Sequence, residues 1–118
     1  MPRDSLEDLN GKLLAFARDR DWEQFHSPKN LSMALAGEAG ELLEHFQWLS
    51  EQQSAALSAE KKDQVALEMA DILIYLIRLA ERLDVDLIDV AYRKIAVNQA
   101  RYPADRVRGD ARRAEEYD

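Results

Sequence analysis

Two pairs of acidic residues fall inside otherwise apolar stretches of the sequence. Glu38 and Glu41 lie in ALAGEAGELLEHFQW, and Glu68 and Asp71 lie in ALEMADILIYLIRL. The spacing of three within each pair places both carboxylates on neighbouring positions of one helix face. An unpaired buried carboxylate is costly, and there are too few nearby Lys and Arg residues to pair all four. If the two pairs face each other across antiparallel helices, divalent cations are the simplest way to make four converging carboxylates tolerable.

The ligand type indicates which cation to expect. Ligands that are all oxygen favour Mg²⁺, with Mn²⁺ as an alternative, and Mg²⁺ commonly shares its coordination shell with substrate phosphates. A di-iron centre would require Glu-x-x-His on two helices, but the chain has only His26 and His45, and His45 follows Glu41 by four residues. Solvated carboxylates that bind no cation remain the other interpretation.

Further polar residues could contact a phosphate. Lys94 and Asn98 are four residues apart near the end of the chain, and Arg101 and Tyr102 follow in RKIAVNQARYP. The spacing places Lys94 and Asn98 on one face of a helix. A solvated surface lysine and an ordinary residue near a helix end explain the same pattern.

A group of ring side chains could enclose a nucleobase. Trp22, Phe25, His26 and Trp48 lie before and after the first acidic pair. Stacking on aromatic rings binds any base, because every base has a π face. Core packing or an amphipathic surface loop explains these residues equally well.

Hydrophobic periodicity predicts an all-α chain with four helices, over residues 5–20, 28–50, 58–83 and 87–100. Ser5, Ser27 and Ser58 are the expected N-caps, and Pro28 suits the first helical position. Pro103 ends the last helix. We therefore expect one domain over residues 1–103 and a charged C-terminal tail over residues 104–118.

The composition excludes several classes of function. The 118 residues carry a net charge of −7, which argues against binding of a nucleic acid polymer, because that requires clustered Lys and Arg. No apolar run is long enough to span a membrane, and no signal peptide is present. The absence of cysteine fits a reducing compartment, so we expect a cytoplasmic protein.

The third predicted helix is apolar on nearly every side. Such a helix lies at the centre of a bundle or is buried by another subunit. In a monomer this short, the apolar faces around Leu73, Ile74 and Ile77 would be exposed. We therefore expect a four-helix bundle that oligomerisation completes.

Taken together, several motifs carry a resemblance to a known family. GEAGEL is followed by EMADILIYL, with RDWEQFHSPKNL before them and KIAVNQARYP after them. In this order they resemble the MazG-like all-α nucleoside triphosphate pyrophosphatases, and most closely their dCTP pyrophosphatase branch, over roughly residues 6–103. Many members of the family have an acid before the first glutamate, where this chain has Gly37, and the dCTP-type branch shares this departure.

The resemblance implies Mg²⁺-dependent hydrolysis of a nucleoside triphosphate to a monophosphate and pyrophosphate, with dCTP or a 5-modified dCTP as the expected substrate. It implies that the four carboxylates of Glu38, Glu41, Glu68 and Asp71 hold the metal, and that Glu38 or Glu41 accepts a proton in catalysis. It also implies a homodimer or homotetramer. It implies that the base and sugar are contacted by Trp22, His26, Trp48 and Tyr75, and that the triphosphate is contacted by Lys94, Asn98, Arg101 and Tyr102. A non-catalytic helical protein that binds nucleotides or a partner with the same fold is the alternative.

Overall fold

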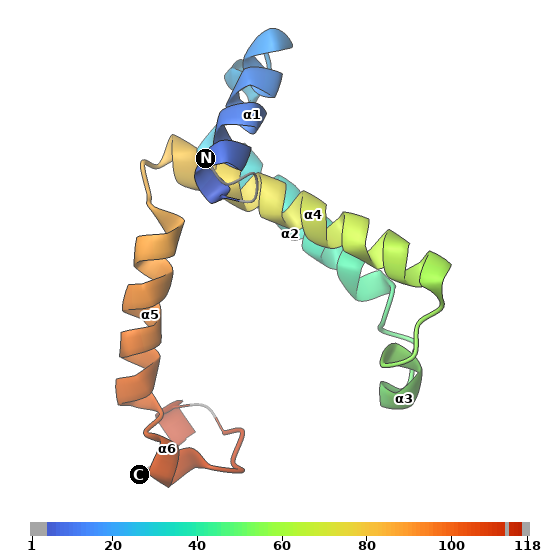
Figure 1. Cartoon of the computed structure of the whole chain (residues 1–118), viewed down its shortest axis with the longest axis vertical. Helices are drawn as coiled ribbons and strands as arrows, with labels where there is room; N and C mark the ends of the chain where they lie inside the picture. Colours follow the sequence, from blue (N-terminus) through green and yellow to red (C-terminus); the bar gives the residue numbers. More distant parts are fainter. Residues whose placement is uncertain (1–4, 113, 117–118) are drawn as a thin grey trace. The chain divides into compact units, whose positions relative to one another are not determined.

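A computed structural model describes residues 5–112 and 114–116 (Figure 1). All regular structure in these residues is helical, and no strand occurs among them, so the predicted all-α class is confirmed. The chain divides into two units, Met1–Val85 and Asp86–Asp118.

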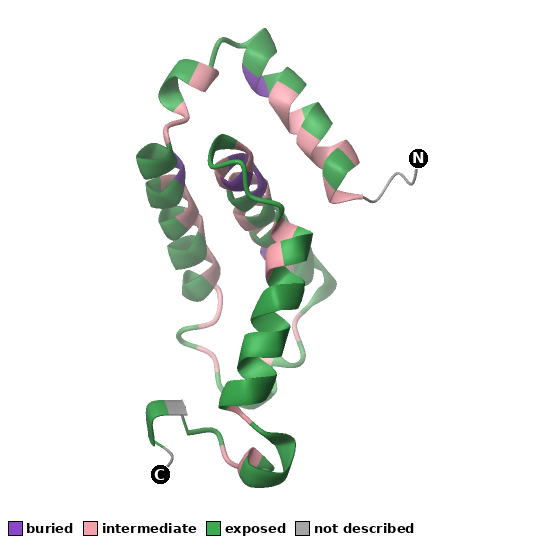
Figure 2. Cartoon of the chain, turned by 90° about the vertical axis from the view of Figure 1, so that its left-hand side faces the viewer, coloured by how far each residue is buried: buried purple, intermediate pink, exposed green. Residues whose placement is uncertain are grey.

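Three long helices form the first unit: α1 (Leu6–Asp19), α2 (Pro28–Glu44) and α4 (Ala59–Arg82). Two short elements, η1 (Glu23–Phe25) and α3 (Glu51–Ser54), lie in the connections. Helix α4 packs against both α2 and α1, as Figure 1 shows. The buried apolar side chains come from these three helices (Figure 2), and they are Ala17, Leu31, Val65, Ile77 and Ala80.

The predicted helix starts are confirmed by the capping interactions. Ser5, Ser27 and Ser58 have extended backbones, and each hydroxyl accepts a hydrogen bond from the amide three residues later, at 3.0, 3.1 and 3.1 Å. Pro28 occupies the start of α2, where no amide hydrogen is needed. These caps satisfy amides that have no partner within their helices.

The predicted end of the second helix at residue 50 is wrong, because α2 ends at Glu44. The amide of Phe46 donates to the carbonyl oxygen of Leu43 at 2.9 Å, which tightens the chain into a turn. Ser50 then begins the short helix α3 with a capping box, in which Ser50 and Gln53 exchange side-chain to backbone hydrogen bonds. A turn therefore ends α2 before the predicted boundary, and a separate short helix begins where the predicted helix was expected to stop.

The second unit contains α5 (Leu87–Arg101), α6 (Ala104–Val107) and η2 (Ala114–Glu116). Asp84 precedes this unit with a φ of 55°, and Asp86 caps α5, so the predicted turn between the last two long helices is confirmed. Short helices occur in the predicted tail, and Arg101 of α5 pairs with Glu115 at 2.7 Å. The division into residues 1–103 and 104–118 stays a prediction.

Helix α4 exposes one apolar stripe in the single chain. Met69, Leu73 and Leu76 follow one another at helical spacing and are 57%, 40% and 36% exposed. Ile77, which the sequence suggested would be exposed in a monomer, is buried at 4%, because it faces the helices packed on α4. Ile74 is half-buried.

No helix in the described part of the chain combines the length and the apolar character that a membrane crossing requires.

Candidate functional site

Three of the four predicted metal ligands come together where α2 packs on α4. Glu38 and Glu41 project from α2, and Glu68 projects from α4. One carboxylate oxygen from each residue lies within 4.8 Å of the other two. The packing of the two helices therefore brings the two acidic motifs together across a gap of about thirty residues in the sequence.

The environment of these carboxylates leaves them in need of a positive partner. Oε2 of Glu38 and Oε2 of Glu68 are buried and have no hydrogen-bond partner among the described residues. The close approach of the Glu68 carboxylate, desolvation, and the neighbouring Glu41 and Asp71 carboxylates raise the pKa of Glu38 from 4.5 to about 7. A hard divalent cation fits this donor set, because it would satisfy the orphaned oxygens and remove the repulsion.

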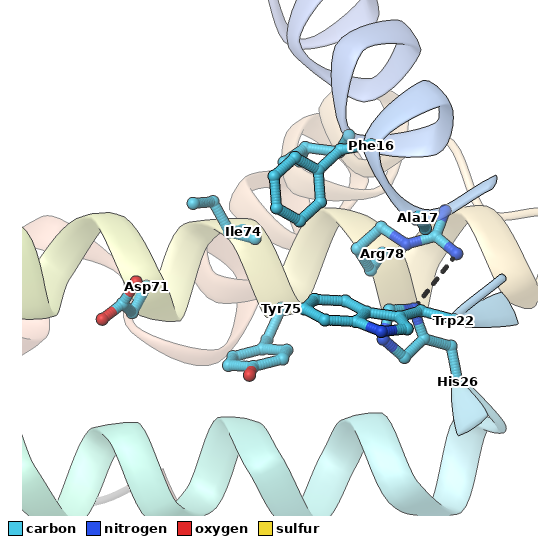
Figure 3. A pocket seen from close by; sticks show the side chains of 9 residues that line it. Phe16, Ala17, Trp22, His26, Asp71, Ile74, Tyr75 and Arg78 are labelled. Atoms are coloured by element: carbon cyan, nitrogen blue, oxygen red, sulfur yellow. Dashed lines mark hydrogen bonds between the residues drawn. The ribbon is translucent and has the colours of Figure 1, made fainter. Parts of the chain in front are cut away.

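Asp71 lies apart from this group of three. It follows Glu68 on α4, and its side chain lines the neighbouring pocket (Figure 3). Its charge still contributes to the raised pKa of Glu38. The structure therefore places the predicted fourth ligand between the carboxylates and the pocket.

The pocket is formed by α1, the connection that contains η1, and α4. It is largely apolar with a few polar groups, as in many sites for small molecules. The lining residues are Leu13, Phe16, Ala17, Trp22, His26, Asp71, Ile74, Tyr75 and Arg78. The structure thus brings together three of the residues predicted to contact the base and sugar: Trp22, His26 and Tyr75 (Figure 3).

Trp48, the fourth predicted base contact, does not line this pocket. It lies in the turn after α2 and is 86% exposed in the single chain. Phe25, which the sequence grouped with the same rings, is also exposed, at 59%.

Edge-to-face contacts connect the pocket's rings. The Phe16 and Trp22 centroids are 5.7 Å apart, and the Trp22 and His26 centroids are 6.5 Å apart, with interplanar angles of 70° and 65°. Sequence reasoning missed Phe16 as a site residue. The available signal was its place in the apolar stripe of the first helix, which Leu13 shares.

Arg78 is the second pocket residue that sequence reasoning did not assign to the site. It is 2% exposed, and its guanidinium contacts Glu81 at 3.2 Å and His26 at 3.5 Å. The signal was its place on the polar stripe of α4 that also contains Glu68, Asp71 and Tyr75.

The predicted phosphate contacts belong to the second unit. Lys94 and Asn98 are exposed on α5. Arg101 pairs with Glu115, and its guanidinium carbon lies 5.7 Å from the centroid of the Tyr102 ring. Their role in binding a phosphate stays a prediction.

These features define a class of all-helical protein that has a cluster of carboxylates on two packed helices and a pocket lined by aromatic rings. The model of the MazG-like family matches residues 34–116, and the chain belongs to this family.

Named relatives support the same assignment. The chain is 46% identical over 112 residues to dCTP pyrophosphatase 1 of Rattus norvegicus, and the match covers 93% of this chain and 66% of the relative. It is 43% identical over 114 residues to dCTP pyrophosphatase 1 of Homo sapiens, covering 95% and 67%. The chain thus spans about two thirds of the length of these relatives.

A solved structure is similar in fold. The crystal structure of a pyrophosphatase from Archaeoglobus fulgidus DSM 4304 superimposes with a TM-score of 0.79 at 36% identity. The match covers 83% of this chain and 92% of that one.

The raised pKa of Glu38 predicts how pH affects stability without metal. The folded chain binds this proton more tightly than the unfolded chain, so the stabilising effect is complete below the ordinary pKa of 4.5 and is lost as pH rises through about 7. In EDTA, the free energy of unfolding of the wild type should therefore fall over this range relative to that of Glu38→Gln. Chemical denaturation of both proteins at a series of pH values measures the difference, and a difference independent of pH would contradict the prediction.

Proposed function

We propose that the protein is a Mg²⁺-dependent nucleoside triphosphate pyrophosphohydrolase, which converts a (deoxy)nucleoside triphosphate to the monophosphate and pyrophosphate. The observation that carries the proposal is the group of Glu38, Glu41 and Glu68, in which Oε2 of Glu38 and Oε2 of Glu68 are buried without a hydrogen-bond partner among the described residues. The similarity to proteins named dCTP pyrophosphatase supports it.

Glu38, Glu41 and Glu68 would hold Mg²⁺, or Mn²⁺ in its place, and Asp71 is the proposed fourth ligand. A bound divalent cation would neutralise phosphate charge and lower the pKa of a coordinated water. This explains how a chain with a net charge of −7 would bind a polyanion. It also explains why Glu38 and Glu68 each keep one buried carboxylate oxygen where α2 packs on α4.

The protein's own groups then have separate tasks. Glu38 or Glu41 accepts the proton of the attacking water. Trp22, His26 and Tyr75 contact the base and sugar, and Trp48 is proposed to join them although it is exposed in the single chain. Contacts with the triphosphate are proposed for Lys94, Asn98, Arg101 and Tyr102.

The proposed base is cytosine, as dCTP or a 5-modified dCTP. This preference rests on the names of the relatives. Aromatic stacking alone accepts any base, so the preference must come from hydrogen bonds to the base edge.

We also propose a homodimer or homotetramer. The exposed stripe of Met69, Leu73 and Leu76 on α4 supports this, because monomers rarely expose large contiguous apolar patches. A cytoplasmic location and the lack of binding to nucleic acid polymers stay predictions from the sequence.

A non-catalytic protein that binds nucleotides is the alternative function. It would bind nucleotide or Mg²⁺ without forming a product. A missing carboxylate would favour it, but all four predicted carboxylates are present in the chain.

Light scattering tests the oligomer. We expect a dimer or tetramer at micromolar concentration, and Leu73→Lys should weaken it, because a lysine ammonium in an apolar interface is costly. Gln64→Lys is the matched control, since it adds the same charge on the polar stripe of α4. A monomeric wild type would contradict the proposal.

Neutralising one carboxylate should separate activity from stability. We expect Glu68→Gln to reduce turnover by roughly 100-fold or more, because it removes a charged metal ligand. In EDTA the variant should be as stable as the wild type or more stable, because repulsion between carboxylates is relieved. Glu44→Gln on the exposed side of α2 is the control and should change neither property. A large loss of metal-free stability in Glu68→Gln would show a structural role instead.

Hydrolysis of dCTP in ¹⁸O-labelled water tests the bond that is broken. If pyrophosphate is the leaving group, water attacks the α phosphorus, so the label should enter the monophosphate and leave the pyrophosphate unlabelled. Labelled orthophosphate, or a nucleoside diphosphate product, would refute the mechanism. Equal rates with dATP and dGTP would remove the cytosine preference and leave the reaction class intact.

A further inference from the structure

Arg78 is a buried cation whose hydrogen bonds are only partly satisfied. Its side chain is 3% exposed, and Nη1 donates to the partly exposed carboxylate of Glu81 at 3.2 Å. Its Nε is buried without a hydrogen-bond partner in the part of the chain that the structure describes. Burying a guanidinium is costly, and a salt bridge to Glu81 would form as well with both side chains at the surface. The position of Arg78 in the pocket therefore calls for another explanation.

The other contact of Arg78 provides one. Nη2 lies 3.5 Å from Nδ1 of His26, as the dashed line in Figure 3 shows. A guanidinium has donors and no acceptor, so Nδ1 must supply the lone pair. A neutral imidazole that accepts at Nδ1 carries its hydrogen on Nε2.

The charges around His26 favour the neutral ring. Burial lowers the pKa of His26, and the cations of Arg78 and Arg82 on α4 lower it further, while Glu23 of η1 opposes them. The charged form is thus disfavoured where the geometry already requires a lone pair on Nδ1. Both observations indicate the same protonation state.

His26 lines the pocket, and no hydrogen-bond partner of its Nε2 is seen within residues 5–112 and 114–116. Trp22 contacts the ring edge-to-face. We propose that Arg78 is a positioning residue that holds His26 as the neutral Nε2–H tautomer, so that the pocket presents a fixed donor to an acceptor atom of the nucleobase.

This inference rests on the proposed function and concerns its base selectivity. Cytosine carries two adjacent acceptors, O2 and N3, on its pairing edge, whereas N3 of uracil and thymine carries a hydrogen. A fixed donor opposite N3 would be paired in cytosine but would face an N–H in uracil or thymine, and an unpaired polar group in the wrong complex costs free energy. His26 would thereby add discrimination that stacking on Trp22 cannot provide.

The tautomer can be measured without any activity. The chain has two histidines, so a long-range ¹H–¹⁵N spectrum of the metal-free protein near neutral pH resolves His26 and keeps His45 as an internal reference. We expect a neutral His26 with hydrogen on Nε2 in the wild type and in Arg82→Met. Arg78→Met should shift the Nδ1 resonance and raise the pKa of His26. A wild-type His26 that is charged or protonated on Nδ1 alone would overturn the proposal, as would equal effects of Arg78→Met and Arg82→Met.

A double-mutant cycle connects the tautomer to recognition. Loss of one hydrogen bond should raise the KM for dCTP by about threefold to tenfold in Arg78→Met, with kcat changed by less than about twofold. His26→Phe should have a similar effect, and adding Arg78→Met to it should change KM little further. Additive effects would show that Arg78 does not act through His26.

Two controls keep the outcomes distinct. Arg78→Lys retains a buried cation but replaces the planar fork of two donor nitrogens with a single nitrogen, so its KM should lie between those of the wild type and Arg78→Met even if the Met variant folds poorly. A wild type that releases no pyrophosphate from any nucleotide would refute the proposed function. The spectrum would still decide whether Arg78 sets the state of His26.

Discussion

Helices α2 and α4 pack side by side through branched apolar residues such as Leu31, Val65 and Ile77. This packing also brings polar residues of the two helices close together. Glu38 and Glu68 follow the same helical register as these core residues, so closing the core places carboxylates against each other. The free energy gained by burying apolar side chains offsets the repulsion between the carboxylates. A cation would remove the repulsion, so folding and metal binding are linked at one contact.

The pocket depends on the same helix, further along the same polar stripe. Helix α4 presents Asp71, Tyr75 and Arg78 toward α1 and the connection that contains His26. One helix therefore carries the proposed metal ligands and the proposed base contacts at successive turns. This arrangement requires a long, straight and well-capped helix, and Ser58 supplies the cap.

The two kinds of buried polar group have different electrostatic requirements. The carboxylates near Glu38 lack a positive partner among the described residues and favour a cation from solution. Arg78 is a cation already, and it disfavours a second positive charge on His26. The structure thus separates an acidic region that would attract a metal ion from a region that disfavours positive charge on His26, and this separation would suit a ligand with an anionic end and an uncharged end.

The sequence alone determined the local features, because caps and helical periodicity depend on neighbouring residues. Ser5, Ser27 and Ser58 begin helices as predicted, and the two acidic motifs were recognisable from spacing. The end of α2 was misjudged, because a turn after Glu44 interrupts a helix that periodicity alone would continue. Contacts between distant segments needed the tertiary structure. Asp71 lies apart from the other carboxylates, and Arg78 contacts a histidine fifty-two residues away. Both features follow from the packing of α1, α2 and α4, and the local sequence does not encode this packing.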